Sequence, residues 1–202
     1  MKKYQMKFEL SAINDITEPT AISIDTKIDA AKQYKRKRGK STSSRNHAKL
    51  QRRIADALHA LYGEKYDILP EFEMDLLQKP SVPDISVFPF KPSDWENDEL
   101  RAKEPPILAI EILSPKQILG DVLKKIRNNY FPGGVQSAWV VLPALKTITV
   151  MSPNGKIQNF NEGILKDDVT GFELNLSQIL NKKGILIKVK SHFDMFKMAF
   201  YL

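Results

Sequence analysis

Two acidic residues lie inside apolar runs of strand length, and this constrains the fold more than any other feature of the chain. Asp84 opens the run VPDISVF, and Glu111 lies within ILAIEIL. Such β-branched runs are typical of strands buried in a sheet. A carboxylate buried there alone costs on the order of several kcal/mol. We therefore expect a compensating partner, and a divalent metal ion shared by both carboxylates is the natural candidate.

A metal ion held by these two carboxylates would suit phosphodiester hydrolysis. The ion would neutralise developing charge and lower the pKa of an attacking water. Mg²⁺, or Mn²⁺ in its place, takes oxygen ligands, which Asp84, Glu111 and the backbone carbonyl of Ile112 would supply. A nearby lysine would orient the water and stabilise the transition state. The alternative interpretation of the two acids is a salt bridge or a solvated strand end.

The periodicity of the remaining chain predicts an α/β fold. Ser44 is a plausible N-cap for a helix over residues 44–62, and residues 117–130 carry an apolar stripe at helical spacing. We expect a mixed sheet of four or five strands flanked by these helices, and a short helix within residues 93–103. The segments predicted as strands are 66–77, 82–88, 107–113, 137–143 and a hairpin around Asn154-Gly155.

Three further residues are candidates for the same site. Glu71 and Glu73 alternate with apolar residues in the predicted strand over 66–77, so one of them would face the site or both would line a solvated outer face. His47 falls in the first turn of the helix over 44–62, on its apolar side, where a histidine is either structural or functional.

The basic residues of the chain are unevenly distributed. The formal net charge is +7, and residues 32–45 form the densest basic run. A basic run favours polyanionic partners through counterion release, although it is also typical of a solvated connector. The predicted contacts to phosphates of the DNA backbone are Lys35, Arg36, Lys37, Arg38 and Lys40.

Composition excludes several classes of protein. The chain has no cysteine, so it has neither disulfides nor thiolate metal sites. It has no apolar run near the ~18 residues of a membrane span and no secretion signal, so we expect no membrane association and a cytoplasmic location. The aromatic tail within residues 181–202 would pack on the domain or on a second subunit, and we expect a homodimer.

Four consecutive motifs resemble a known family. PDISVF, AIEILSP, the spacing of Asp121 and Lys125, and YFPGGVQSAWVVLP together resemble the Uma-type putative restriction endonuclease family of the PD-(D/E)XK nuclease superfamily. The resemblance runs from about residue 44 to 180. It implies an N-terminal extension over residues 1–43, a nuclease-like domain over 44–180, and a C-terminal strand and amphipathic tail over 181–202.

The resemblance also assigns roles to individual residues. Asp84, after Pro83, matches the first acid, and Glu111 matches the second. The superfamily pattern places a lysine two residues after the second acid, where this chain has Leu113. In the Uma-type family the lysine is expected from the following helix, which indicates Lys125. The other lysines in reach are Lys124 and Lys116.

The implied function is a Mg²⁺- or Mn²⁺-dependent endonuclease that acts on DNA. Because the superfamily lysine is displaced, the alternative is a catalytically inactive nucleic-acid-binding or dimeric assembly module on the same fold. Lys125 also lies four residues after Asp121, so the two could form an ordinary surface ion pair instead.

Overall fold

The computed structural model describes residues 43–77 and 79–180. The chain divides into two units, residues 1–42 and 43–202, and all described residues belong to the second. The basic residues predicted to contact DNA, and the aromatic tail, therefore lie outside the described residues.

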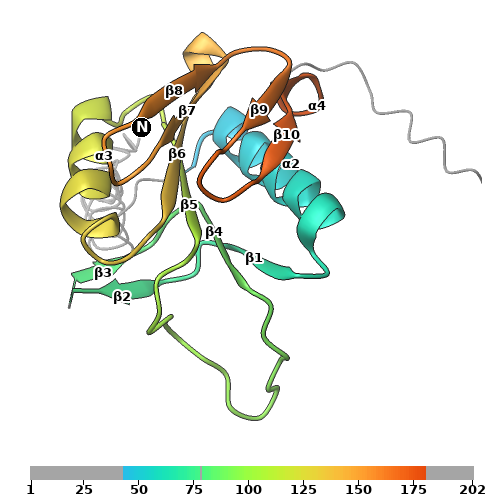
Figure 1. The fold of residues 1–202 in the computed structure, drawn as a ribbon, viewed down its shortest axis with the longest axis vertical. Coiled ribbons are helices and arrows are strands. Elements are labelled where there is room, and N and C mark those ends of the chain that lie inside the picture. The colour runs from blue at the N-terminus through green and yellow to red at the C-terminus, as the bar shows by residue number, and fades with distance from the viewer. Residues whose placement is uncertain (1–42, 78, 181–202) are drawn as a thin grey trace, which may run out of the picture. The chain divides into compact units, whose positions relative to one another are not determined.

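A mixed six-stranded sheet forms the centre of this unit (Figure 1). The strand order is β1-β4-β5-β6-β7-β8, with β5 and β6 parallel and all other neighbours antiparallel. The predicted α/β fold with a mixed sheet is confirmed, although the sheet has six strands rather than four or five. The strands are β1 (Tyr66–Pro70), β4 (Ile85–Pro89), β5 (Leu108–Ile112), β6 (Ser137–Leu142), β7 (Thr147–Met151) and β8 (Ile157–Phe160).

Both faces of the sheet are covered, so β5 is buried along its whole length. One face packs against α2 (Arg45–Tyr62) and α4 (Leu176–Leu180), together with the hairpin of β9 (Ile164–Lys166) and β10 (Glu173–Asn175). The other face packs against α3 (Leu119–Lys125) and the π-helical turn η1 (Ile126–Tyr130), with β2 (Met74–Leu76) alongside. Because side chains alternate along a strand, Ala109 and Glu111 face the α3 side while Leu108, Ile110 and Ile112 face α2.

The start of α2 is fixed as the sequence predicts. Ser44 adopts an extended conformation as the N-cap, and its hydroxyl accepts a hydrogen bond from the backbone N–H of His47. His47, Leu50, Ile54 and Leu58 form the buried stripe of the helix. The parallel β5–β6 pair is joined by α3 and η1, the crossover that parallel strands require.

The single strand predicted over residues 66–77 is wrong. The chain leaves the main sheet at Pro70, and Glu71 has a left-handed backbone with φ of 52°. This breaks the alternation, and β2 then pairs with β3 (Lys79–Ser81) in a separate two-stranded sheet. Glu71 and Glu73 therefore do not share one continuous strand face.

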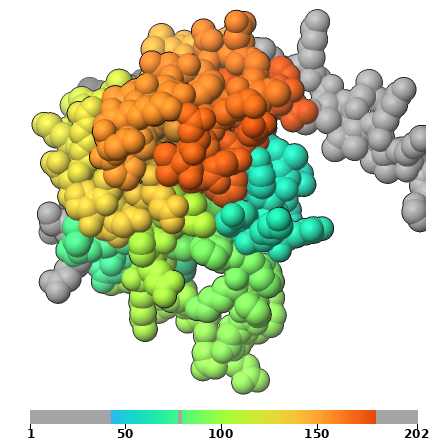
Figure 2. Space-filling view, in the orientation of Figure 1, coloured from blue at the N-terminus to red at the C-terminus, as the bar shows by residue number. Residues whose placement is uncertain are grey.

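One local prediction, the short helix within residues 93–103, also needs correction. Residues 93–103 form no helix, because the Asp94 carboxylate accepts hydrogen bonds from the backbone N–H groups of Glu96 and Asn97 and holds a turn instead. This loop between β4 and β5 projects from the body at the lower edge of Figure 2. A short 3₁₀ turn, η2 (Pro143–Leu145), connects β6 to β7.

The β7–β8 hairpin forms around Asn154-Gly155 as predicted. The carbonyl of Ser152 accepts a hydrogen bond from the N–H of Gly155, so Pro153 and Asn154 are the central residues. Pro153 suits the first central position of a type I turn, and Gly155 follows with φ of 85°. No helix in the described part of the chain has the length and apolarity that a bilayer crossing demands.

The packing of α2 yields a stability prediction. Ile54 is completely buried, whereas Leu61 on the same helix is exposed. We expect Ile54→Ala to lower the free energy of unfolding by about 2–5 kcal/mol through lost burial and a cavity. The control Leu61→Ala should change it by less than about 0.5 kcal/mol. Urea unfolding followed by circular dichroism measures both, and equal effects would contradict this packing.

Candidate active site

Asp84 and Glu111 lie on neighbouring strands, and both are buried. Asp84 immediately precedes β4 and is 2 % exposed, and Glu111 lies in β5 and is 3 % exposed. The backbone N–H of Asp84 donates to the carbonyl of Ile110 at 3.0 Å, which extends the β4–β5 pairing to this residue. The sheet therefore brings the two predicted acids to the same end of β5.

The Asp84 carboxylate binds the backbone of β5. Its Oδ2 accepts a hydrogen bond from the N–H of Ile112 at 2.6 Å. The N–H and C=O of one strand residue face the same neighbour, so the Ile112 carbonyl also faces the side of Asp84. The Asp84 carbonyl in turn accepts hydrogen bonds from the Gln51 side-chain amide at 2.8 Å and the Glu71 N–H at 3.2 Å.

The Glu111 carboxylate is held by two side chains of the following helix. Lys125 Nζ lies 2.8 Å from Glu111 Oε1, and the Tyr130 hydroxyl donates a hydrogen bond to the same oxygen. Lys125 Nζ also lies 3.4 Å from the Val82 carbonyl and 5.1 Å from the centre of the Tyr130 ring. Lys125 thus pairs with Glu111 and keeps 30 % of its side chain exposed to solvent.

The π-helical turn η1 allows both side chains to reach one oxygen. Lys125 and Tyr130 are five residues apart, and in an α-helix with 3.6 residues per turn they would point about 140° apart. In η1 the hydrogen bonds run between residues five apart, as from the N–H of Phe131 to the carbonyl of Ile126. This wider turn brings residues five apart onto nearly the same side, a geometry often found at functional sites.

Burial keeps Tyr130 protonated. Desolvation, followed by the adjacent Glu111 carboxylate, raises the pKa of the Tyr130 phenol well above its ordinary value of 10.0. The neutral phenol can therefore only donate its proton in a hydrogen bond to the carboxylate. Together with Lys125, it compensates the buried charge of Glu111.

His47 reaches the site from the first turn of α2. Its Nε2 lies 3.3 Å from Asp84 Oδ1, and its Nδ1 lies 3.1 Å from the hydroxyl oxygen of Ser114, which follows β5. Of the two open interpretations of His47, the geometry favours contact with the site. Serine hydrolases use the same three residue types, but there Nε2 faces serine and Nδ1 faces aspartate, the reverse of this arrangement.

The other predicted candidates lie apart from the carboxylates. The Glu73 carboxylate pairs with Arg101 at 2.9 Å, on the loop that leads into β5. The backbone N–H of Glu71 donates a hydrogen bond to the Asp84 carbonyl. Lys124 and Lys116 are both exposed, whereas Lys125 contacts Glu111.

Three residues at the site were not predicted from the sequence. They are Tyr130 on Glu111, Ser114 on His47, and Gln51 on the Asp84 carbonyl. Tyr130 was expected only as part of an apolar stripe with Ile118, Val122 and Ile126, and of these Ile118 is exposed. The position of Ser114 directly after the run that contains Glu111 was the one available signal.

The donor atoms suit a hard divalent cation. Within residues 43–77 and 79–180, no group of three or more histidine, aspartate or glutamate side chains converges on one point. The oxygens that could hold a metal ion are the carboxylates of Asp84 and Glu111 and the carbonyl of Ile112, and Mg²⁺ typically uses one or two carboxylates and completes its shell with water and phosphate oxygens. The residues present therefore fit such an ion.

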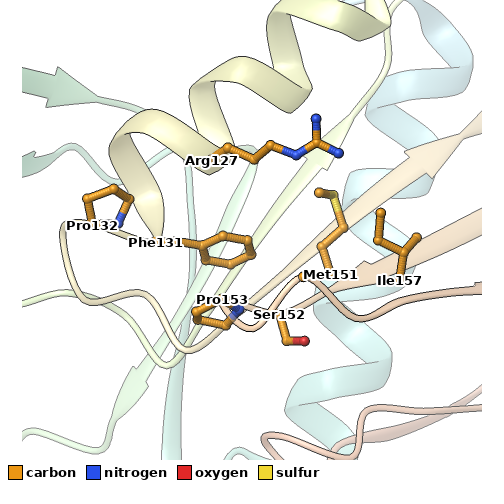
Figure 3. A pocket seen from close by; sticks show the side chains of 8 residues that line it. Arg127, Phe131, Pro132, Met151, Ser152, Pro153 and Ile157 are labelled. Carbon is orange, nitrogen blue, oxygen red and sulfur yellow. The ribbon is translucent and has the colours of Figure 1, made fainter.

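Two pockets flank these elements. One of about 570 Å³ lies between α2 and β1, and Gln51 and Glu71, which both bond to the Asp84 carbonyl, are among its lining residues. The second, of about 460 Å³, lies between the end of η1 and the β7–β8 hairpin and is lined by Arg127, Phe131 and Met151 among others (Figure 3). Neither Asp84 nor Glu111 is among the lining residues of these two pockets, and the first is next to the Asp84 carbonyl through Gln51 and Glu71.

Comparison with known proteins places this site in context. A model of the family described as "Uma2: Putative restriction endonuclease" matches residues 33–177. A crystal structure described as "a putative nuclease belonging to DUF820" from Anabaena variabilis ATCC 29413 aligns with a TM-score of 0.62 and 22% identity. The alignment covers 70% of this chain and 83% of that chain, and at this identity it shows a shared fold. No curated protein matches the chain.

The raised pKa of Tyr130 predicts a pH dependence. The unfolded chain ionises this phenol near its ordinary pKa of 10.0, whereas the folded chain keeps it protonated to higher pH. The contribution of Tyr130 to the free energy of unfolding is therefore complete below pH 10. It is lost as the pH rises toward the pKa of the phenol in the folded chain, by up to about 1.4 kcal/mol per pH unit.

We expect Tyr130→Phe to remove the part of the decrease in the free energy of unfolding above pH 10 that comes from this phenol. Urea unfolding between pH 8 and about 11 measures it, as the difference in the free energy of unfolding between wild type and variant. Parallel curves for the two proteins would contradict the assigned environment of the phenol.

Proposed function

Because the chain belongs to the Uma2 family, described as "Putative restriction endonuclease", we propose that it is a Mg²⁺-dependent endonuclease that hydrolyses phosphodiester bonds of DNA. One observation carries the proposal. Two buried carboxylates, Asp84 and Glu111, meet at the end of β5, and the ammonium group of Lys125 is bound to one of them. We interpret this as a PD-(D/E)XK-type arrangement in which a helix supplies the lysine.

Each residue has a defined part in this mechanism. A bound Mg²⁺ or Mn²⁺ ion would neutralise charge on the phosphate and lower the pKa of water. Asp84 would hold it with a carboxylate fixed by the N–H of Ile112, and Glu111 and the Ile112 carbonyl would supply further oxygens. Lys125, partly exposed beside Glu111, would orient the attacking water and stabilise the charge of the transition state. Tyr130 would hold the Glu111 carboxylate in place.

The distribution of charge supports a separate role for the segments outside residues 43–180, which carry net charges of +5 over residues 1–42 and +4 over residues 181–202. Residues 43–180 contain 16 lysines and arginines against 18 aspartates and glutamates, so the excess positive charge of the chain lies outside this range. A polyanion gains affinity mainly from cations that neutralise its phosphates. We therefore assign contacts with the DNA backbone to Lys35, Arg36, Lys37, Arg38 and Lys40. The homodimer through residues 181–202 stays a prediction.

The second candidate function is a binding or assembly module without turnover. It is favoured by Leu113, which occupies the position of the superfamily lysine and is half-buried in the α3-side core. Such a module would bind DNA without a metal requirement. The two functions therefore differ in whether a divalent ion is needed.

Nicking of supercoiled plasmid tests the site directly. We expect cleavage by the wild type with Mg²⁺ or Mn²⁺, loss of cleavage in EDTA, and a loss of at least about 100-fold in Asp84→Ala and Lys125→Ala. The exposed neighbour Lys124 provides the matched control, and Lys124→Ala should cleave at close to the wild-type rate. Loss of cleavage in Lys124→Ala with retention in Lys125→Ala would contradict the assigned lysine. DNA binding by a wild type that never cleaves would favour the second function.

The basic segment is tested by the salt dependence of binding. Replacing Lys35, Arg36, Lys37, Arg38 and Lys40 by alanine should weaken DNA binding and reduce the slope of log K against log salt by up to about 4. Fluorescence anisotropy with Ca²⁺ in place of Mg²⁺ measures this without cleavage. The double replacement of Lys156 and Lys166, whose side chains pair with Asp168 and Glu173, serves as the control. An unchanged slope in the five-residue variant would move the DNA contact elsewhere.

A further inference from the structure

We propose that His47 is a positioning residue for the Asp84 carboxylate, acting through Nε2, while its Nδ1 is held by a hydrogen bond with Ser114. This inference rests on the proposed function, because Asp84 is there the first metal ligand. It gives α2 a second contact with Asp84, beside the hydrogen bond that the Gln51 amide donates to the Asp84 carbonyl.

The imidazole is enclosed between the two strands that carry the site. His47 is 4 % exposed, and both ring nitrogens face polar atoms of other elements. Nδ1 lies 3.1 Å from the Ser114 hydroxyl oxygen after β5, and Nε2 lies 3.3 Å from Asp84 Oδ1 before β4. Nε2 makes no hydrogen bond of good geometry with any described residue, although the carboxylate is its neighbour.

Electrostatics select one tautomer of the ring. If Nδ1 carried the hydrogen, the lone pair of Nε2 would face a carboxylate oxygen at 3.3 Å, and two acceptors would repel in a buried, weakly screened environment. If the Ser114 hydroxyl donates to Nδ1 instead, the N–H of Nε2 points toward Asp84 and the contact is attractive. Ser114 can donate in this way, because its hydroxyl carries a hydrogen that rotates freely.

The two oxygens of Asp84 are therefore fixed from opposite sides in different ways. Oδ2 accepts a short hydrogen bond of 2.6 Å from the Ile112 N–H, whereas Oδ1 faces the imidazole across a longer and poorly aligned contact. The long contact orients Oδ1 relative to the imidazole. Mutation of a residue that contacts a metal-binding carboxylate typically lowers the metal affinity 10- to 100-fold.

The backbone of α2 fixes the position of the ring. The N–H of His47 is held by the Ser44 N-cap, and Leu50 and Ile54 on the same stripe pack into the core. The imidazole is thus placed by a capped and anchored helix rather than by a loop. The geometry of Asp84 then depends on how α2 docks against the sheet.

Two substitutions separate the functions of the two ring nitrogens. The terminal nitrogen of a glutamine side chain is as many bonds from Cα as histidine Nε2, and that of asparagine is as many as Nδ1. We expect His47→Asn to weaken Mn²⁺ binding about 10- to 100-fold, and His47→Gln to retain it within about threefold of wild type. Isothermal titration with Mn²⁺ alone measures affinity without substrate, and thermal unfolding without metal reports on folding.

Ser114→Ala provides a second test that leaves the imidazole in place. It removes the hydroxyl that holds Nδ1 and with it the orientation of the ring, so it should weaken Mn²⁺ binding while the metal-free melting temperature changes little. This variant decides the question if either substitution of His47 prevents folding. A Ser114→Ala protein with wild-type Mn²⁺ affinity would then overturn the inference.

The outcomes distinguish this inference from the proposed function. Mn²⁺ binding that is lost in Asp84→Ala but kept in His47→Asn overturns the role of His47 alone. Equal losses in His47→Asn and His47→Gln also overturn it, because they would show that Nε2 has no special part. A wild type that binds no Mn²⁺ overturns the proposed metal-dependent function together with this inference.

Discussion

The structure depends on the compensation of two carboxylates that are buried side by side at one end of β5. Each would be costly to bury alone, and each neighbouring element supplies a different compensating group. The backbone of β5 donates to Asp84, α2 brings His47 against its second oxygen, and α3–η1 brings Lys125 and Tyr130 to Glu111. A catalytic metal ion would join a site that the fold already holds in place.

The crossover between the parallel strands β5 and β6 determines which side chains reach Glu111. A regular α-helix in this position could present Lys125 or Tyr130 to the carboxylate, but not both. The π-helical turn over residues 126–130 removes that restriction. Lys125 is partly exposed, so water competes with Glu111 for hydrogen bonds to its ammonium group. The neutral phenol of Tyr130 adds a second donor to the same oxygen, and this donor is fully buried. The local irregularity of the helix is thus directly coupled to the chemistry of the site.

The sequence predicted the parts of the site that follow from hydrophobic patterning. Asp84 and Glu111 interrupt apolar runs, and the stripe of α2 correctly placed His47 on the buried side. The choice of Lys125 came from a family resemblance, and the structure places it on Glu111. Tyr130 was missed because a 3.6-residue period assigns it to the core, and the π turn has no sequence period of its own. The strand over 66–77 failed because alternation cannot detect the left-handed backbone at Glu71. Contacts such as Ser114 to His47 join residues distant in sequence, so only the fold reveals them.

The most direct test of the central claim is anomalous diffraction from crystals of the wild-type chain soaked in Mn²⁺. The account predicts one strong anomalous peak at the end of β5, about 2.0–2.2 Å from a carboxylate oxygen of Asp84 and a carboxylate oxygen of Glu111. The peak should be absent from crystals of Asp84→Ala. A peak at another place, or no peak at millimolar Mn²⁺, would contradict the account. The buried carboxylates would then be a structural feature of the fold.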